Sequence, residues 1–423
     1  MYQIENTRQV IERRARFSLW PARWPNVGRT VVLLGLTSLL TDISAEMVST
    51  VLPLYLFVTL RLPPLQFGII DGIYQGASVL VRLASGFVAD RRGASKAVAV
   101  LGYALSALTK PGLLVAQGAA AFTGLVIVDR IGKGIRTAPR DAMISRSGPE
   151  AGLATAFGVH RAMDTAGAML GPLLAFALLA IVPGSFDAVF VVSSCFAVLG
   201  VAVIALFVRE PRPDPQDGES VPDRISLAQA ARLVHDPSFR RLVAVGALLA
   251  LTTISDGFLY LVVQRQVGLS AGIFPLLFVG TALAFMVTAV PIGRMADRVG
   301  RSRVFVAGYV LLGVLYGTLL IPGPGPWLAV VVVAMLGIHY AMTDGVIQAL
   351  ASARVAPHLR GTGLGLLASA TSVTRLLASV LFGLAWTMYD VVGAVAVFLV
   401  GLSIAIVIGI LAFAREGRAS AYA

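Results

Sequence analysis

Residues 391–414 form a run of 24 residues that contains no charged side chain. At ~1.5 Å per residue, a helix of this length can cross the ~30 Å hydrocarbon layer of a bilayer. Similar apolar runs recur along the 423-residue chain, of which 57% is hydrophobic and 13% is charged. This composition is typical of a multi-pass membrane protein and lies outside the range of soluble globular proteins.

A hydropathy window of ~20 residues predicts twelve membrane helices. They are expected near 31–59, 65–89, 97–117, 119–143, 152–181, 186–208, 240–263, 272–294, 303–321, 327–350, 362–388 and 391–414. A segment rich in Pro, Asp and Arg, 209–224, separates two groups of six. We therefore expect an N-terminal tail (1–30), a six-helix bundle (31–208), a central loop (209–239), a second six-helix bundle (240–414) and a C-terminal tail (415–423).

The net charge of +12 is best explained by the membrane topology, because the basic residues lie mainly in the connections between the predicted helices. They form short clusters between apolar segments rather than one basic domain, so nucleic acid is not an expected partner. Alternate connections place most of them on one side, whereas Arg61 and Arg265 are nearly alone on the other. The positive-inside rule then predicts that both termini and the central loop are cytoplasmic. The single cysteine, Cys195, excludes an internal disulfide and a multi-cysteine metal site.

The two halves share a repeated motif. The sequence GFVADRRGASK at 86–96 recurs as GRMADRVGRSR at 293–303, an offset of 207 residues. The repeat indicates two homologous halves. The shared positions are Gly86, Asp90, Arg91 and Gly93 in the first copy, and Gly293, Asp297, Arg298 and Gly300 in the second.

Together, the two motif copies and the six-plus-six topology resemble the major facilitator superfamily of secondary transporters. VDRIGKGIRTAPRDA at 128–142 resembles the fourth-helix motif of that family, and GAMLGP at 167–172 resembles its fifth-helix antiporter motif. TDISAEM in the first helix and DRIGKGIRTAPRD in the fourth resemble a bacterial subgroup. The resemblance implies an all-α fold of two pseudo-symmetric six-helix bundles in the bacterial cytoplasmic (inner) membrane, working by alternating access. It also implies that contacts of Asp90 and Asp297 with helix N-termini near Gly361 and Gly152 latch the outward-facing state. Alternatively, the arginines of these loops only hold them inside.

Charged side chains near mid-membrane cost about 2.5–3.5 kcal/mol each and persist when they are paired, hydrated or functional. Asp129, Lys133, Arg136 and Arg140 follow an i, i+4, i+7, i+11 progression, which makes a basic ladder on one helix face. Pro139, Arg140 and Asp141 are expected to end this helix and form an inner gate. The candidate coupling and cavity residues of the first half are Asp42, Glu46, Asp129, Arg130, Lys133, Arg136, Arg161 and Asp164.

Two interpretations of these charges remain open. In the functional one, Asp42 or Glu46 exchanges a proton as Arg130 approaches or withdraws, which biases the rocking of the two halves. In the structural one, static pairs such as Arg130 with Asp42 and Arg161 with Asp164 hold the first half together.

The second half carries fewer mid-membrane charges: Asp256, Asp344 and Arg375. Arg375 needs at least one of these carboxylates as its partner. This uneven distribution suggests coupling in the first half and more substrate contacts in the second.

Glycines in the fifth predicted helix, Gly167 and Gly171, allow close backbone approach, and Pro172 allows a local bend. In the tenth, Met335, His339 and Met342 share one side and could suit a soft metal ion, but a packed histidine is the commoner arrangement. No metal or other cofactor is therefore expected.

The sequence predicts a proton-coupled exporter of a small organic compound, acting as a monomer and not as an enzyme. The basic ladder suggests that an anionic or amphiphilic substrate is tolerated. The alternatives are proton-coupled uptake of a nutrient or metal complex, and a non-transporting assembly or sensor protein.

Overall fold

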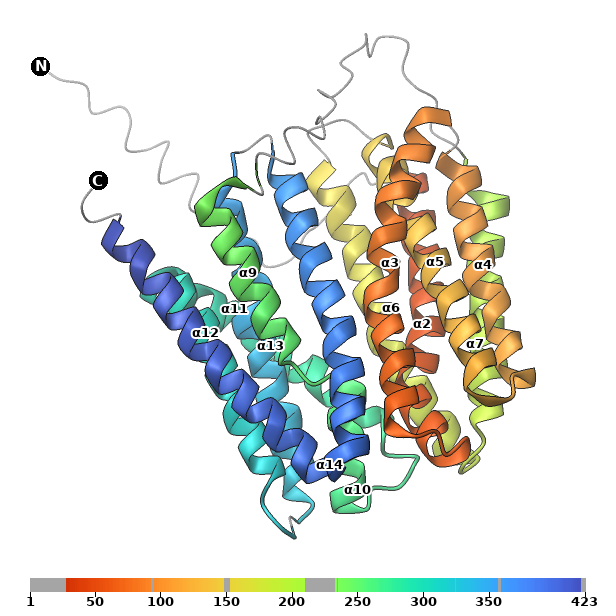
Figure 1. The fold of residues 1–423 in the computed structure, drawn as a ribbon. Helices are drawn as coiled ribbons and strands as arrows, with labels where there is room; N and C mark the ends of the chain where they lie inside the picture. Colours follow the sequence, from red (N-terminus) through yellow and green to blue (C-terminus); the bar gives the residue numbers. More distant parts are fainter. Residues whose placement is uncertain are drawn as a thin grey trace, which may run out of the picture.

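The computed structural model describes residues 28–92, 95–147, 153–209, 233, 235–323, 325–356 and 359–419. Within these ranges, the side chains of residues 79–80, 82–92, 153–154, 361 and 415–419 are not described. The described chain is helical, and it forms two bundles that stand side by side (Figure 1).

The first bundle contains six spans. They are α2 (Arg29–Leu54) with the π-helical segment η1 (Tyr55–Thr59), α3 (Pro64–Arg92), α4 (Ser95–Val115), α5 (Gly118–Ser145), α6 (Leu153–Ile181), and α7 (Phe186–Ala202) with the π-helical segment η3 (Val203–Phe207).

The second bundle contains the helices α9 (Pro237–Leu251), α10 (Asp256–Val267), α11 (Pro275–Val299), α12 (Arg301–Leu319), α13 (Trp327–Arg354) and α14 (Arg360–Ala419). α9 and α10 together form one broken span. α14 contains two spans, because Asp390 interrupts the helix with φ 64° and ψ −174°. Its carboxylate accepts a hydrogen bond from the Gly393 amide (3.0 Å) and so caps the last helix.

The number of spans agrees with the expected twelve. Nine helical stretches of the described residues are long and apolar enough to cross a membrane, and one of them, Thr362–Ala414, holds the two spans on either side of Asp390. The more polar helices α3 and α5, with 29 and 28 residues, complete the set. Large apolar side chains lie exposed on the outer helix faces, where lipid would cover them; examples are Val198, Leu206, Val330, Val400 and Leu411.

The sequence missed a break in the seventh span, which was expected to be continuous over 240–263. Residues 252–255 are not helical, and Ser255 caps the new helix α10. The Tyr316 hydroxyl accepts a hydrogen bond from the Ile254 amide (2.7 Å) and donates one to the Thr252 carbonyl (3.3 Å). Backbone groups freed by the break are thus satisfied inside the bundle, as membrane depth requires.

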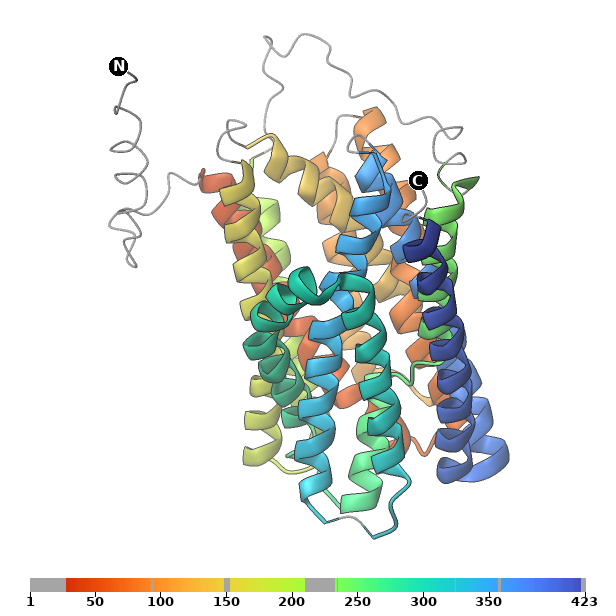
Figure 2. The same cartoon turned by 90° about the vertical axis from the view of Figure 1, so that its left-hand side faces the viewer.

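Glycine permits the turn between α11 and α12, since Gly300 has φ 113°, a conformation that other residues rarely adopt. We call the end of the molecule where α11 meets α12 and α3 meets α4 the motif end. α2 and α9 begin there, on the side to which the sequence assigns the cytoplasm (Figure 2).

The two bundles touch most closely toward the end opposite the motif end. There, a Cβ atom added at Gly68 of α3 would lie 2.5 Å from the Ser379 carbonyl oxygen of α14, and one added at Gly383 would lie 2.5 Å from the Pro64 carbonyl oxygen. Aromatic rings from both bundles fill the same region; they are Phe57, Phe67, Phe258, Phe382 and Trp386. These contacts close the space between the bundles at the opposite end.

One further expectation is wrong. α5 does not end at Pro139–Asp141 but continues as a helix to Ser145, with Pro139 buried inside it. A proline at this position removes one backbone donor, yet the surrounding packing keeps the helix intact.

Candidate functional site

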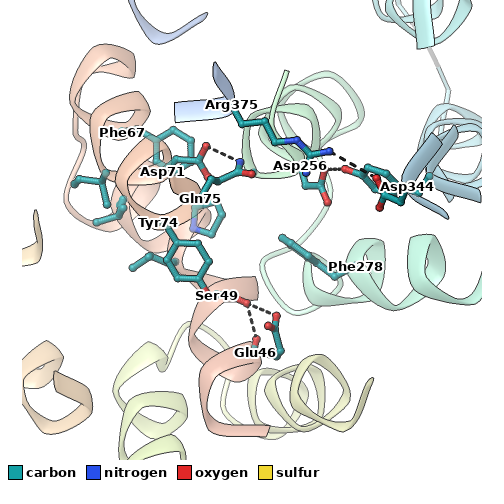
Figure 3. A pocket seen from close by; sticks show the side chains of 16 residues that line it. Glu46, Ser49, Phe67, Asp71, Tyr74, Gln75, Asp256, Phe278, Asp344 and Arg375 are labelled. Atoms are coloured by element: carbon teal, nitrogen blue, oxygen red, sulfur yellow. Dashed lines mark hydrogen bonds and ion pairs between the residues drawn. The ribbon is translucent and has the colours of Figure 1, made fainter. Parts of the chain in front are cut away.

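A central cavity of about 370 Å³ lies between the two bundles (Figure 3). Side chains of both bundles line it, among them Glu46, Ser49, Asp71, Tyr74, Gln75, Asp256, Phe278, Tyr340, Asp344 and Arg375. The polar groups therefore meet at the interface between the two bundles.

On the side of the second bundle, two carboxylates are held differently. Asp256, the first residue of α10, accepts a hydrogen bond from the Tyr340 hydroxyl of α13. Asp344 lies 3.7 Å from Arg375, and their side chains are 48% and 39% exposed to the cavity space. Arg375 thus has the partner that the sequence required, while Asp256 has a neutral donor.

On the side of the first bundle, the carboxylates of Glu46 and Asp71 have neutral hydrogen-bond donors. The Ser49 hydroxyl donates to Glu46 (2.6 Å) on the same helix. Asp71 accepts a hydrogen bond from Ser379 of α14 (2.7 Å) and one from Gln75 (3.3 Å).

A second cavity, of about 440 Å³, lies within the first bundle toward the motif end. Lys133, Arg136 and Arg140 of the basic ladder line it, together with Asp42 of α2. Arg136 lies 3.6 Å from Asp42 and stacks on the Tyr103 ring. The ladder residues therefore face inward as the helical spacing predicted.

Arg140 makes a separate network at the same cavity. Its guanidinium lies 2.9 Å from Asp141 and 3.8 Å from Asp164, and it donates a hydrogen bond to Ser38 (3.2 Å). These contacts join α5, α6 and α2.

Three of the deeply buried charged side chains form a triad that the sequence did not suggest. Asp129 accepts a hydrogen bond from Lys110 of α4 (3.0 Å) and pairs with the neighbouring Arg130. The side chains of these three residues are at most 9% exposed. Arg130 also stacks on the ring of Tyr74, 3.8 Å from its centroid, and so connects the triad to a wall of the central cavity.

The static pairs considered from the sequence are not the ones that form. Arg130 pairs with Asp129 rather than Asp42, because the adjacent carboxylate is within reach of the same buried guanidinium. Asp42 pairs with Arg136, and Asp164 with Arg140. Arg161 is exposed and lines both the second cavity and a third one of about 750 Å³, whose other walls come from the second bundle.

Gly167 and Gly171 place α6 against α2 beside its two carboxylates. A Cβ atom at Gly167 would lie 3.2 Å from the Asp42 Cβ, and one at Gly171 would lie 2.7 Å from the Glu46 Cβ. The expected close backbone approach is confirmed, and Pro172 lies within the continuous helix α6.

The second copy of the repeated motif, at 293–303, is exposed in this structure. Asp297 forms an ion pair with Arg301 (2.8 Å), one turn further along, with its side chain 62% exposed. A Cβ at Gly293 would meet no atom within 4 Å. Arg298 lies in the last turn of α11.

Part of the predicted latch falls outside the described part of the chain. Gly93 and Gly152 are outside the described residues. At Gly86, Asp90, Arg91 and Gly361 only the backbone is described.

His339 is packed rather than presented to a ligand. Its Nδ1 lies 2.9 Å from the Gly308 carbonyl oxygen, and its ring contacts that of Tyr309 edge-on and that of Tyr340 at a tilt. Among the described residues, no group of three or more His, Cys, Asp or Glu side chains is placed to hold a metal ion.

Lys110 and Asp71 are the cavity and network residues that the sequence interpretation missed. Both stand within predicted membrane spans, so the rule that an ionisable residue at membrane depth is a functional candidate could have identified them.

The sequence of the chain is similar to that of known proteins over most of its length. A family model described as Major Facilitator Superfamily matches residues 34–262 and 242–421. An uncharacterised MFS-type transporter of Methanocaldococcus jannaschii is 30% identical over 398 residues, which cover 91% of this chain and 94% of that protein. An uncharacterised protein of Mycobacterium tuberculosis is 27% identical over 386 residues, covering 89% and 90%.

Solved structures share the fold at low sequence identity. A variant of the nucleoside transporter NupG has a TM-score of 0.77 at 15% identity, covering 91% of this chain and 99% of that one. The peptide transporter POT in complex with sulfate has a TM-score of 0.74 at 14% identity, covering 92% and 95%. A bacterial homologue of the lysosomal transporter Spinster, inward-facing and unoccupied, has a TM-score of 0.71 at 16% identity, covering 90% and 96%.

Proposed function

The chain belongs to the major facilitator superfamily of transporters, and on that premise we propose that it is a proton-coupled exporter of a small organic compound. It works as a monomer in the bacterial cytoplasmic membrane, with both termini in the cytoplasm. Export exchanges the compound for protons by alternating access.

The contacts between the bundles support an inward-facing state. The close contact of α3 with α14 at Gly68 and Gly383, together with the aromatic rings, closes the end opposite the motif end. The second and third cavities lie on the other side of the central cavity, toward the motif end. If the motif end is cytoplasmic, a compound enters the central cavity from the cytoplasm in this state.

The packing of the antiporter-like motif against α2 is the observation that carries the proposal. Gly167 and Gly171 contact α2 beside Asp42 and Glu46, so a shift of α6 along this contact changes the surroundings of both carboxylates. Lys133 interacts electrostatically with both carboxylates. Glu46 lines the central cavity and Asp42 lines the second, so the two carboxylates can exchange protons with different cavities.

The same pattern assigns roles to the remaining charges. Arg136 balances Asp42 and releases it when protonation removes the negative charge. Arg140, with Asp164 and Asp141, braces the motif end of α5 against α6. Asp256, Asp344 and Arg375 contact the substrate from the second bundle.

The test begins with a search for ligands of the purified protein. A thermal-shift screen against metabolites, drugs and metal chelates identifies compounds that stabilise the folded state. Compounds that bind are then added to sealed proteoliposomes that contain a pH-sensitive dye. An antiporter that takes up the compound releases lumenal protons, so the lumen becomes more alkaline, whereas a symporter acidifies it.

Two variants test the coupling residues in the same vesicles. Asp42→Asn and Glu46→Gln should each abolish the proton movement while expression and ligand-induced stabilisation persist. Asp187→Asn, which neutralises an exposed carboxylate at the start of α7, is the matched control. Undiminished proton movement in both variants contradicts the assignment. Ligand binding without any transport favours a non-transporting protein.

A further inference from the structure

The carboxylate of Asp71 connects the two bundles, and the proposed coupling does not use it. Asp71 belongs to α3, but its hydrogen bond from Ser379 (2.7 Å) comes from α14 of the other bundle. Ser255, the cap of α10, faces the same carboxylate from a second helix of that bundle. The carboxylate of Asp71 is therefore bonded to α14 and lies beside α10.

This connection lies between the central cavity and the closed end. Asp71 lines the cavity, as Figure 3 shows. Around it, α3 and α14 cross on glycines: a Cβ at Gly72 would lie 2.7 Å from the Leu376 carbonyl oxygen, and one at Gly68 would lie 2.5 Å from that of Ser379. The contact between α3 and α14 at these glycines forms or separates as a unit, because a small displacement of one helix already breaks the packing.

The negative charge of Asp71 strengthens the hydrogen bonds that its carboxylate accepts, and it also attracts competing donors. Its hydrogen bonds from neutral donors to a carboxylate are stronger than those between neutral groups. No ion pair with Asp71 occurs among the described side chains, and its neighbour across the cavity is another carboxylate, Asp256. A donor that enters the cavity, above all a cationic one, can therefore compete with Ser379 for the carboxylate.

We propose that Asp71 links occupancy of the cavity to opening of the closed end. A substrate with an ammonium or comparable donor group takes the place of Ser379 on the Asp71 carboxylate. Loss of the Ser379 bond separates α14 from α3, and the path to the opposite side opens. This inference rests on the proposed export function, to which it adds the substrate class and a positioning residue.

The experiment measures opening directly and needs no transport. Spin labels are placed through Val58→Cys and Met388→Cys, exposed positions near the closed end of each bundle, in a Cys195→Ser background. Electron–electron distance measurements in lipid nanodiscs then give the fraction of molecules open at this end.

Ser379→Ala should raise the open fraction about tenfold, since it removes a hydrogen bond to a charged acceptor without adding volume. Asp71→Asn, which keeps the shape but not the charge, should raise it in the same direction. Thr387→Val is the matched control, because the Thr387 hydroxyl donates only to the Gly383 carbonyl of its own helix. An open fraction unchanged by both Ser379→Ala and Asp71→Asn overturns the connection.

A pair of probes of similar size tests the substrate class. Phenethylammonium should raise the open fraction of the parent protein but not of Asp71→Asn, whereas phenylacetate should have no effect on either. An equal response to both probes, or no response to phenethylammonium, overturns the substrate class. Opening that follows these expectations in a protein that moves no protons would contradict the proposed function and leave this inference intact.

Discussion

The two bundles carry their membrane charges in different settings. In the first, Lys110 and Asp129 form a pair whose side chains are 6% and 9% exposed. In the second, Arg375 and Asp344 are 39% and 48% exposed, on the wall of the central cavity. Each pair joins a basic side chain to an aspartate, but the two pairs differ in their access to a ligand.

This difference separates structural charges from exchangeable ones. A fully buried pair is desolvated, and its members depend on each other. A half-exposed pair keeps contact with water, so either member can turn to another partner at little cost. The first bundle therefore uses the triad to fix α4, α5 and the Tyr74 ring in place, and the second leaves its charges available to the cavity.

The largest effect is expected when the triad is broken. Asp129→Asn leaves Lys110 and Arg130 without a charged partner, and losing one member of a buried pair costs about 3–5 kcal/mol. The free energy of unfolding, measured in detergent by tryptophan fluorescence, should fall by that amount. The double variant Lys110→Met with Asp129→Asn restores charge balance and should recover part of the loss. A loss below ~1 kcal/mol for the single variant would show that water reaches the triad.

An intermediate effect is expected at the contact of α6 with α2. In Gly171→Ala, the new methyl group would lie 2.7 Å from the Glu46 Cβ and 2.8 Å from the Ile43 carbonyl oxygen. Overpacking of this kind costs about 1–3 kcal/mol. On the same helix, Gly158→Ala adds a methyl group with no neighbour within 4 Å, and should instead stabilise the protein by up to ~1 kcal/mol. Equal unfolding energies for the two variants would contradict the close contact.

Sequence patterns predicted the features that depend on one helix at a time. Apolar runs gave the spans, and the spacing of Lys133, Arg136 and Arg140 placed them on one inward face. The small size of Gly167 and Gly171 predicted a close helix contact, although not which helix they meet.

The partners of the charges could not be predicted, because they depend on the rotation of several helices relative to one another. The sequence predicts that Arg130 reaches α2, but its guanidinium pairs with the adjacent Asp129, and Arg136, six residues further along α5, pairs with Asp42. The break at Thr252–Ser255 was missed for a similar reason. Its backbone groups are satisfied by Tyr316, which is 62 residues from Ile254 along the chain.

The smallest effect on stability is expected at the pair in the second bundle. Arg375→Gln removes an ion pair of 3.7 Å that is about two-fifths exposed, and solvent screening limits the loss to less than ~1 kcal/mol. The same change should strengthen binding of an ammonium compound found in the thermal-shift screen about tenfold, since the cavity wall loses a positive charge and Asp344 loses its ion-pair partner. Isothermal titration with one such compound measures the affinities of Arg375→Gln and of Asp344→Asn. The free energy of unfolding of each variant is measured in parallel by tryptophan fluorescence. A large loss of stability with unchanged affinity would mean that this pair, like the triad, holds the fold together, and the contrast between the bundles would disappear.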